Sequence, residues 1–269
     1  MPYAQNAVDG TSVYFEDDGG SGVPVVLYGG ILDSVESVRA SQLARALQDA
    51  TEFRLVYADH RGLGRSDKHP DTTAYAMPLQ VADFVAVLMA LGVERSHLVG
   101  RSYGARLAFG VGEHAPERVR SLVIGGQQPY ALNPDGPLIR TLAGATDATR
   151  REGAARFVEA LEAHSGARIP VFERNVYVGQ DGPSVAAAFE AMLASGDLST
   201  RLDQWSVPCL VYLGAGDEDF YEQARRAAAQ IPNAEFVGLE ELDHLAAHFA
   251  ADRIAAEVIR FLRDNELVS

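Results

Sequence analysis

The sequence predicts an α/β fold, a mostly parallel eight-stranded sheet flanked by helices, with a helical insertion. Short apolar runs rich in β-branched residues alternate with longer segments in which apolar residues recur every three or four positions. Such alternation is typical of strands joined by crossover helices in a parallel sheet. With 269 residues, of which 47% are apolar and 22% charged, the chain is also long enough to bury one large core.

The strands are predicted in order along the chain. A turn at Asp9-Gly10 between two short apolar runs indicates an opening hairpin. The two arms of this hairpin and the six later strands are expected at residues 4–8, 12–15, 23–28, 53–58, 97–99, 119–124, 209–213 and 235–239. The only cysteine, Cys209, falls in one of these strands, so we expect a buried, inert thiol and no internal disulfide.

Helices are predicted where apolar residues repeat along one face of a segment. They are expected at residues 42–49, 79–91, 103–114, 221–230 and 254–264. From about Gln127 to Thr200 the alternation with strands stops, and this segment predicts two or three helices, such as 149–164 and 184–193. We therefore divide the chain into a core, residues 1–126 and 201–269, and a helical cap, residues 127–200.

Composition restricts the partners and the location of the protein. The chain has 37 acidic and 23 basic side chains and a net charge of −14. The electric field of this charge repels nucleic acid and anionic membranes. The N-terminus lacks the basic start and apolar stretch of a signal peptide, and no apolar run is long enough to span a bilayer. We expect a cytoplasmic protein with a small-molecule substrate, no nucleic-acid or membrane partner and no cofactor or metal; a homodimer is left open.

The strongest local motif is Gly100-Arg101-Ser102-Tyr103-Gly104, which matches G-x-S-x-G between a predicted strand and a predicted helix. A serine nucleophile must project from a sharp, strained turn, and glycines on both sides leave room for such a backbone. The helix that follows directs its N-terminus at the serine, so we expect the amide of Tyr103 to donate to a developing oxyanion. An ordinary strand-to-helix turn is the alternative explanation of these residue types.

A serine hydroxyl needs a base to remove its proton. His244 is the first candidate, because it is expected on a loop between the last strand and the last helix, at the C-terminal edge of the sheet. His248 is the alternative base, and the two histidines would also make a metal pair, although no third ligand is evident. The other histidines are expected to be core or solvated residues: His60, His69, His97, His114 and His164.

The acid that orients the histidine should follow the preceding strand. Asp217 does so, at the end of a Gly-x-Gly turn, while Asp219 and then Glu218 are close enough to compete for this role. A second oxyanion donor is expected in the glycine-bearing loop after the first buried strand. There the amide of Ile31 is the predicted donor and Gly30 is the alternative.

Together with a second motif, these residues resemble the α/β-hydrolase superfamily over residues 8–262. The segment Asp59-His60-Arg61-Gly62-Leu63-Gly64-Arg65-Ser66-Asp67 is similar to the family's D-x-R-G-x-G-x-S loop, which is architectural, so no catalytic role is expected for Asp59 or Arg61. The resemblance implies a serine hydrolase whose insertion forms a cap between the sixth strand and the acid-bearing segment. Many relatives carry His-Gly before the oxyanion donor, and this chain departs from that pattern with Gly29-Gly30.

The predicted function is hydrolysis of a carboxylic ester or lactone of a small, fairly apolar acid through an acyl-enzyme at Ser102. Aminopeptidase or amidase, carbon–carbon hydrolase and lyase reactions are alternatives on the same three side chains. Epoxide hydrolysis and dehalogenation are disfavoured, because relatives with that chemistry have aspartate in place of Ser102. A receptor that binds a ligand without turnover is the alternative of another class. Cap residues expected either to line a substrate pocket or to pack the cap onto the sheet are Phe157, Leu161, Phe172, Phe189 and Met192.

Overall fold

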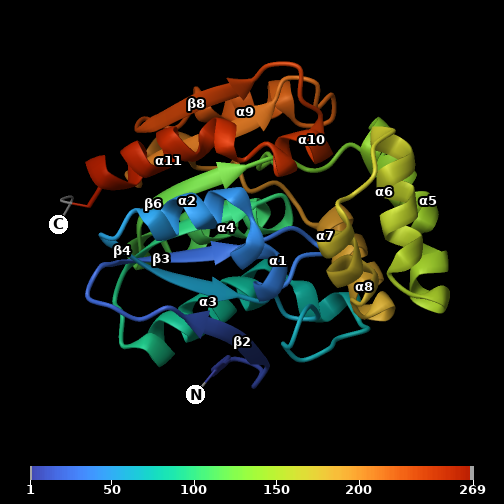
Figure 1. Ribbon diagram of the computed structural model, residues 1–269, viewed down its shortest axis with the longest axis horizontal. Helices are drawn as coiled ribbons and strands as arrows, with labels where there is room; N and C mark the ends of the chain where they lie inside the picture. The colour runs from blue at the N-terminus through green and yellow to red at the C-terminus, as the bar shows by residue number, and fades with distance from the viewer. Residues whose placement is uncertain (1, 267–269) are drawn as a thin grey trace.

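The computed structural model describes residues 2–266 and shows one continuous sheet with helices on both faces (Figure 1). Its strands are β1 (Tyr3–Gln5), β2 (Ser12–Asp17), β3 (Val23–Tyr28), β4 (Phe53–Ala58), β5 (Ser96–Arg101), β6 (Val119–Gly125), β7 (Cys209–Gly214) and β8 (Ala234–Leu239). Across the sheet they follow the order β1-β2-β4-β3-β5-β6-β7-β8. The β1–β2 and β2–β4 pairs are antiparallel and the other pairs are parallel, which confirms the predicted fold class.

The helices outside the insertion cover both faces of the sheet. They are α1 (Val35–Ala40), α2 (Gln42–Asp49), α3 (Met77–Leu91), α4 (Tyr103–His114), α9 (Tyr221–Ala228), α10 (His244–Phe249) and α11 (Asp252–Asp264). Short 3₁₀ turns lie at Thr72–Tyr75, Pro116–Arg118 and Leu202–Gln204. The helices α1, α10 and the 3₁₀ turns were not expected from the sequence, because segments of three to six residues carry too little periodicity to be recognised.

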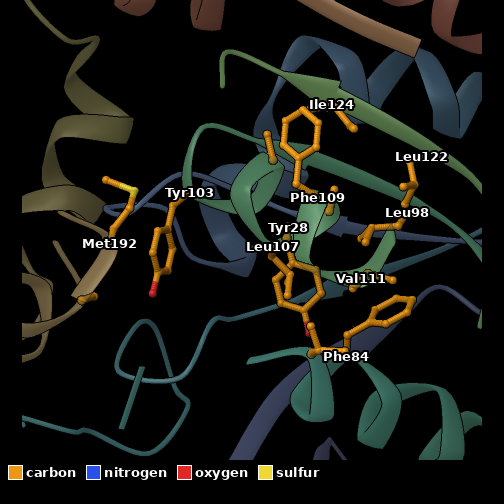
Figure 2. Close-up of a cluster of buried hydrophobic side chains, with 14 of the residues drawn as sticks. Tyr28, Phe84, Leu98, Tyr103, Leu107, Phe109, Val111, Leu122, Ile124 and Met192 are labelled. Atoms are coloured by element: carbon orange, nitrogen blue, oxygen red, sulfur yellow. The ribbon is translucent and has the colours of Figure 1, made fainter. Parts of the chain in front are cut away.

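Two apolar cores form because successive residues of a strand point to opposite faces of the sheet. Val26 and Leu98 pack in the core that α3, α4 and α9 cover, whereas Val25 and Val99 pack in the core under α2 and α11. Figure 2 shows part of the first core, in which Phe84 of α3 and Leu107, Phe109 and Val111 of α4 meet side chains of the sheet. Burial of this kind is the main force that holds the helices on the sheet.

The insertion between β6 and β7 forms four helices that lie together at one end of the molecule (Figure 1). They are α5 (Pro137–Glu152), α6 (Ala155–Ser165), α7 (Val171–Val178) and α8 (Gly182–Ala194). The prediction of two or three helices, with one continuous helix over residues 149–164, is therefore wrong. The helix ends before Gly153, whose φ of 104° lies outside the helical region. The apolar periodicity that suggested one helix continues across this interruption.

A single buried side chain of α4 holds both ends of this insertion. Nη1 of Arg106 donates to the carbonyl oxygens of Gln128 and Tyr130, at 2.9 and 2.8 Å, where the insertion begins. Nη2 donates to Oγ of Ser195 and to the carbonyl oxygen of Gly196, at 3.0 and 2.7 Å, where the insertion ends. Burial lowers the pKa of Arg106 to about 10, so its guanidinium is still charged at neutral pH.

The D-x-R-G loop after β4 is held by a buried ion pair. Arg61 donates from Nε and Nη2 to the two carboxylate oxygens of Asp83, at 2.6 and 2.7 Å, and from Nη1 to Asp9, at 2.9 Å. The side chain of Arg61 is fully buried and that of Asp83 is 5% exposed. These contacts fasten the loop to α3 and to the opening hairpin, which is the architectural role expected for Arg61.

No helix within residues 2–266 is both long enough and apolar enough to cross a membrane. Cys209 lies buried in β7, where burial raises the pKa of its thiol well above the ordinary range. The thiol is thus protonated at neutral pH, as expected for an inert side chain.

The substitution Asp83→Asn tests the buried pair. It leaves the charge of Arg61 without its bidentate partner inside the protein, and we expect the free energy of unfolding to fall by about 3 kcal/mol in urea titrations. Asp264→Asn is the matched control, because Asp264 pairs with Arg260 at the surface, and a loss below about 1 kcal/mol is expected there. Equal losses in the two variants would contradict a structural role for the buried pair.

Candidate functional site

Ser102 lies at the turn between β5 and α4 in a strained conformation, with φ 53° and ψ −109°. The glycines two residues before and two residues after Ser102 leave no room for a larger side chain. A Cβ on Gly100 would collide with the carbonyl oxygen of Gly104, and a Cβ on Gly104 would collide with that of Tyr28. The turn is held by backbone hydrogen bonds from Ser102 to Gly125, 2.7 Å, and from Gly104 to Gly29, 2.9 Å. Strain of this kind persists only where the surroundings fix the backbone.

The structure brings Ser102, His244 and Asp217 together into one hydrogen-bonded relay. Oγ of Ser102 lies 3.1 Å from Nε2 of His244, and Nδ1 of His244 lies 2.7 Å from Oδ2 of Asp217. The three residues follow β5, β8 and β7, whose carboxyl ends meet at one edge of the sheet. Because a carboxylate only accepts hydrogen bonds, His244 donates from Nδ1 and presents the lone pair of Nε2 to the serine hydroxyl.

The backbone of His244 is held from two sides. His244 is the first residue of α10, and not a loop residue as expected, because Asp243 caps that helix by accepting from the amide of Ala246. The guanidinium of Arg101, next to the nucleophile, donates from Nη2 to the carbonyl oxygen of His244 at 2.9 Å. Both contacts limit the positions that the imidazole can take relative to Ser102.

The competing residues lie elsewhere. Asp219 accepts from the amide of Leu138 in the cap, at 2.7 Å, and Glu218 is exposed to solvent. Nε2 of His248 contacts the hydroxyl of Tyr177, at 2.9 Å. Within residues 2–266, no three His, Cys, Asp or Glu side chains gather as ligands for a metal ion.

The loop after β3 is folded so that one of its two predicted oxyanion donors is already engaged. The amide of Gly30 donates to Oδ2 of Asp33 at 2.6 Å, so Gly30, the alternative donor, is not available. The carbonyl oxygen of Gly30 accepts from the amide of Asp33 at 3.0 Å. In a planar trans peptide the N–H of Ile31 points opposite to this carbonyl, and hence away from Asp33. Ile31 lines the pocket that contains Ser102 and His244.

The amide of Tyr103 is the other predicted donor. Tyr103 is the first residue of α4, where the backbone N–H groups have no partner within the helix. Its side chain is buried in the same apolar core as Met192 of the cap helix α8, and both are labelled in Figure 2. The amides of Tyr103 and Ile31 therefore come from the start of α4 and from the loop after β3, two segments that adjoin Ser102, as an oxyanion hole requires.

His60 is a residue of the site whose contacts were not expected. Its Nε2 lies 3.1 Å from the carbonyl oxygen of Gly29, and its ring packs between Tyr28 and Tyr103, with both centroid distances at 4.7 Å. Burial lowers the pKa of His60 to about 4, so the neutral ring donates this hydrogen bond. His60 is a core histidine, as expected, but it also supports the loop that carries Ile31. The sequence signal for this supporting role was the position of His60 directly after β4, at the carboxyl edge of the sheet.

A narrow pocket of about 50 Å³ lies beside Ser102 between the core and the cap. Its apolar walls are formed by Ile31, Leu32, Leu138, Leu142, Phe157, Leu161 and Leu245, and its polar wall by Asp33, Arg101 and Tyr177. Of the five apolar cap residues singled out in the sequence, Phe157 and Leu161 line this pocket. Phe189 packs against Phe157 inside the cap, and Phe172 is 51% exposed on the surface.

Comparison with known proteins identifies a family that this chain matches. A family model described as the alpha/beta hydrolase fold matches residues 23–212. A proline iminopeptidase of Xylella fastidiosa (strain Temecula1) is 30% identical over 204 residues, 74% of this chain, and the chain spans only 58% of that relative. A proline iminopeptidase of Xanthomonas citri is 32% identical over 255 residues, which cover 88% of this chain and 72% of the relative.

Solved structures share the fold over the whole chain. An enol-lactonase of Burkholderia xenovorans superimposes with a TM-score of 0.81 at 24% identity, covering 97% of this chain and 100% of that one. A thermophilic esterase of Thermogutta terrifontis has a TM-score of 0.81 at 23% identity and covers 98% of both chains. At these identities the likeness concerns the fold.

Asp217→Asn tests the relay. The amide no longer stabilises the imidazolium that forms when His244 takes the serine proton, so we expect Ser102 to react with a fluorophosphonate at least about a thousandfold more slowly. Asp219→Asn is the matched control and should react at the wild-type rate, because its side-chain oxygen still accepts from Leu138. The rates follow from quenched labelling time courses, and a larger loss in the Asp219 variant would reverse the assignment of the acid.

Buried histidines give the fold a defined response to acid. Burial lowers the pKa of His60 and of His97 to about 4 and that of His248 to about 3. An unfolded histidine takes up its proton near pH 6.5, so this contribution to stability is present above that pH and is lost as the pH falls toward 4. We expect the free energy of unfolding to decrease over this window by about 1 kcal/mol per pH unit for each histidine.

The measurement is urea unfolding at several pH values between 4 and 7. His97→Gln is the informative variant, because His97 lies in β5, bonded to Ser121, and belongs to neither the relay nor the pocket. This variant should reduce the pH dependence of the free energy of unfolding by the contribution of one histidine. An unchanged slope would contradict this origin of the acid sensitivity.

Proposed function

The chain belongs to the alpha/beta hydrolase fold family, and from that premise we propose that it is a serine hydrolase of carboxylic esters or lactones. The observation that carries the proposal is the continuous relay from Ser102 through His244 to Asp217. A small-molecule substrate fits a pocket that is narrow and enclosed by the cap.

In the proposed mechanism, Oγ of Ser102 attacks the carbonyl carbon while Nε2 of His244 takes the hydroxyl proton. Asp217 stabilises the imidazolium, and the amides of Ile31 and Tyr103 donate to the oxyanion of the tetrahedral intermediate. The intermediate collapses by breaking the carbon–oxygen bond of the ester, and the imidazolium protonates the leaving alkoxide. Water, activated by the same imidazole, then hydrolyses the acyl-enzyme and regenerates the Ser102 hydroxyl.

The walls of the pocket support a short, apolar acyl group. Seven of the thirteen lining residues carry large apolar side chains, and the volume of about 50 Å³ leaves little room for a long chain. A substrate of this kind gains binding free energy from apolar contact and leaves the hydrogen bonds of Asp33, Arg101 and Tyr177 largely unchanged.

Hydrolysis of an N-terminal residue from a peptide is a second candidate, favoured by the identity of 30 to 32% with the two iminopeptidases. Such an enzyme has to bind the ammonium group of its substrate, which calls for a carboxylate in the pocket. Among the described residues, Asp33 is the one carboxylate in the lining, and it already accepts from Gly30, Ser37 and Tyr177. This occupation supports the ester or lactone over the peptide.

A substrate panel separates the two candidates. We expect the protein to cleave p-nitrophenyl acetate and butyrate and a γ-lactone, with p-nitrophenyl octanoate slower and proline p-nitroanilide slowest. Ser102→Ala should lower each rate at least about a thousandfold, because no nucleophile remains. Ser206→Ala, on the exposed surface, is the control and should behave as the wild type.

Three outcomes would change the proposal. Faster turnover of proline p-nitroanilide than of any ester would establish the peptidase alternative. Ester turnover that survives unchanged in the Ser102 variant would remove this serine from the mechanism. A chain that binds these compounds without turnover would be a receptor on the hydrolase scaffold.

A further inference from the structure

Beside the relay, a second hydrogen-bonded chain joins three parts of the fold. Asp33 comes from the loop after β3, Tyr177 from the cap helix α7 and His248 from α10. Oη of Tyr177 lies 2.8 Å from Oδ1 of Asp33 and 2.9 Å from Nε2 of His248. Asp33 and Tyr177 are each only 3% exposed, so bulk water does not compete for these contacts.

The protons in this series of hydrogen bonds can be assigned by asking which groups are able to donate and which only accept. Burial raises the pKa of Asp33, but the electrostatic interactions with His248 and Arg101 and the hydrogen bonds from Gly30 and Ser37 outweigh it and keep the pKa below its ordinary value. Asp33 is therefore a carboxylate, which only accepts, and Tyr177 donates its single hydroxyl proton to it. The oxygen of Tyr177 then accepts from Nε2–H of His248.

The other end of Asp33 controls the backbone of the candidate oxyanion loop. Oδ2 accepts from the amide of Gly30, and the amide of Asp33 donates to the carbonyl of the same glycine. The bond to Oδ2 holds the peptide between Gly29 and Gly30, and the bond to the carbonyl holds the peptide between Gly30 and Ile31, so Gly30 is fixed on both sides and with it the direction of the Ile31 amide. A rotation of the Asp33 side chain would release the amide of Gly30, directly before the peptide that carries the Ile31 N–H.

We propose that Asp33, Tyr177 and His248 form a latch that completes the oxyanion hole when the cap is seated on the core. The cap supplies Tyr177, Tyr177 fixes Asp33, and Asp33 directs the amide of Ile31 toward the reacting carbonyl. All three are positioning residues, because they act through the loop and not on the reacting atoms. The inference rests on the proposed function in that it takes Ile31 as an oxyanion donor.

Tyr177→Phe tests the latch, because it removes one hydroxyl and keeps the ring that packs in the cap. We expect fluorophosphonate labelling of Ser102 to slow about tenfold, less than the hundred- to thousandfold that follows when an oxyanion donor is removed outright. Tyr130→Phe is the matched control, since the hydroxyl of Tyr130 accepts from Gln230 in an exposed contact outside the site, and it should label at the wild-type rate. With an ester, kcat should fall about tenfold while KM changes less than about twofold, because the lost interaction acts in the transition state.

A rescue pair separates the latch from a general loss of structure. His248→Gln keeps a side-chain N–H for Tyr177 and should retain most of the labelling rate, whereas His248→Leu should resemble Tyr177→Phe. Equal melting temperatures for the two His248 variants accompanied by different rates would support the latch. Equal rates in these two variants, or a wild-type rate in Tyr177→Phe, would overturn it.

The labelling experiment also keeps the two proposals apart. The probe reports the reactivity of Ser102 whatever the natural substrate, so an enzyme that prefers amides to esters still tests the latch. A wild-type protein that does not label at Ser102 would overturn the serine hydrolase itself, and the latch with it. Normal wild-type labelling with no effect of Tyr177→Phe would overturn the latch alone.

Discussion

The site depends on the close approach of two backbones at Gly104. The first turn of α4 contacts the end of β3 so tightly that Gly104 donates to the carbonyl of Gly29 and has no room for a Cβ. This contact joins the strained turn of Ser102 to the loop that carries Ile31. Ser102 and both candidate oxyanion amides are thus brought close together, and His60 supports the loop of Ile31 through Gly29.

Much of the site was predictable because it follows the ends of parallel strands. Buried strands are continuous apolar runs, so β3 and β4 were predicted with their observed bounds. Ser102 was placed by its G-x-S-x-G motif, and Asp217 and His244 by their positions after later strands. The latch was not predictable, because Asp33 and Tyr177 are 144 positions apart and a single sequence does not show which side chains meet. The helices of the cap were misjudged for a related reason, since periodicity continues across a break of two residues.

The short helix α10 couples parts of the protein that the sequence keeps separate. Its first residue, His244, belongs to the relay, and His248, one turn later, belongs to the latch. Asp243, which caps this helix, also accepts from the hydroxyl of Ser165 in the cap helix α6 at 2.8 Å. The cap is therefore bonded to the helix that carries His244 through Asp243, and to the loop of Ile31 through Asp33.

Arg106 fastens the beginning and the end of the insertion with the two nitrogens of one guanidinium. Because these ends are held side by side, the sheet does not depend on the length of chain between them, and the entropy of closing such a loop grows only slowly with its length. The region from Gln128 to Gly196 is thus an exchangeable module. Substrate preference can diverge, or be redesigned, by replacing this module, provided that the new segment again supplies a hydroxyl to Asp33 in the place of Tyr177.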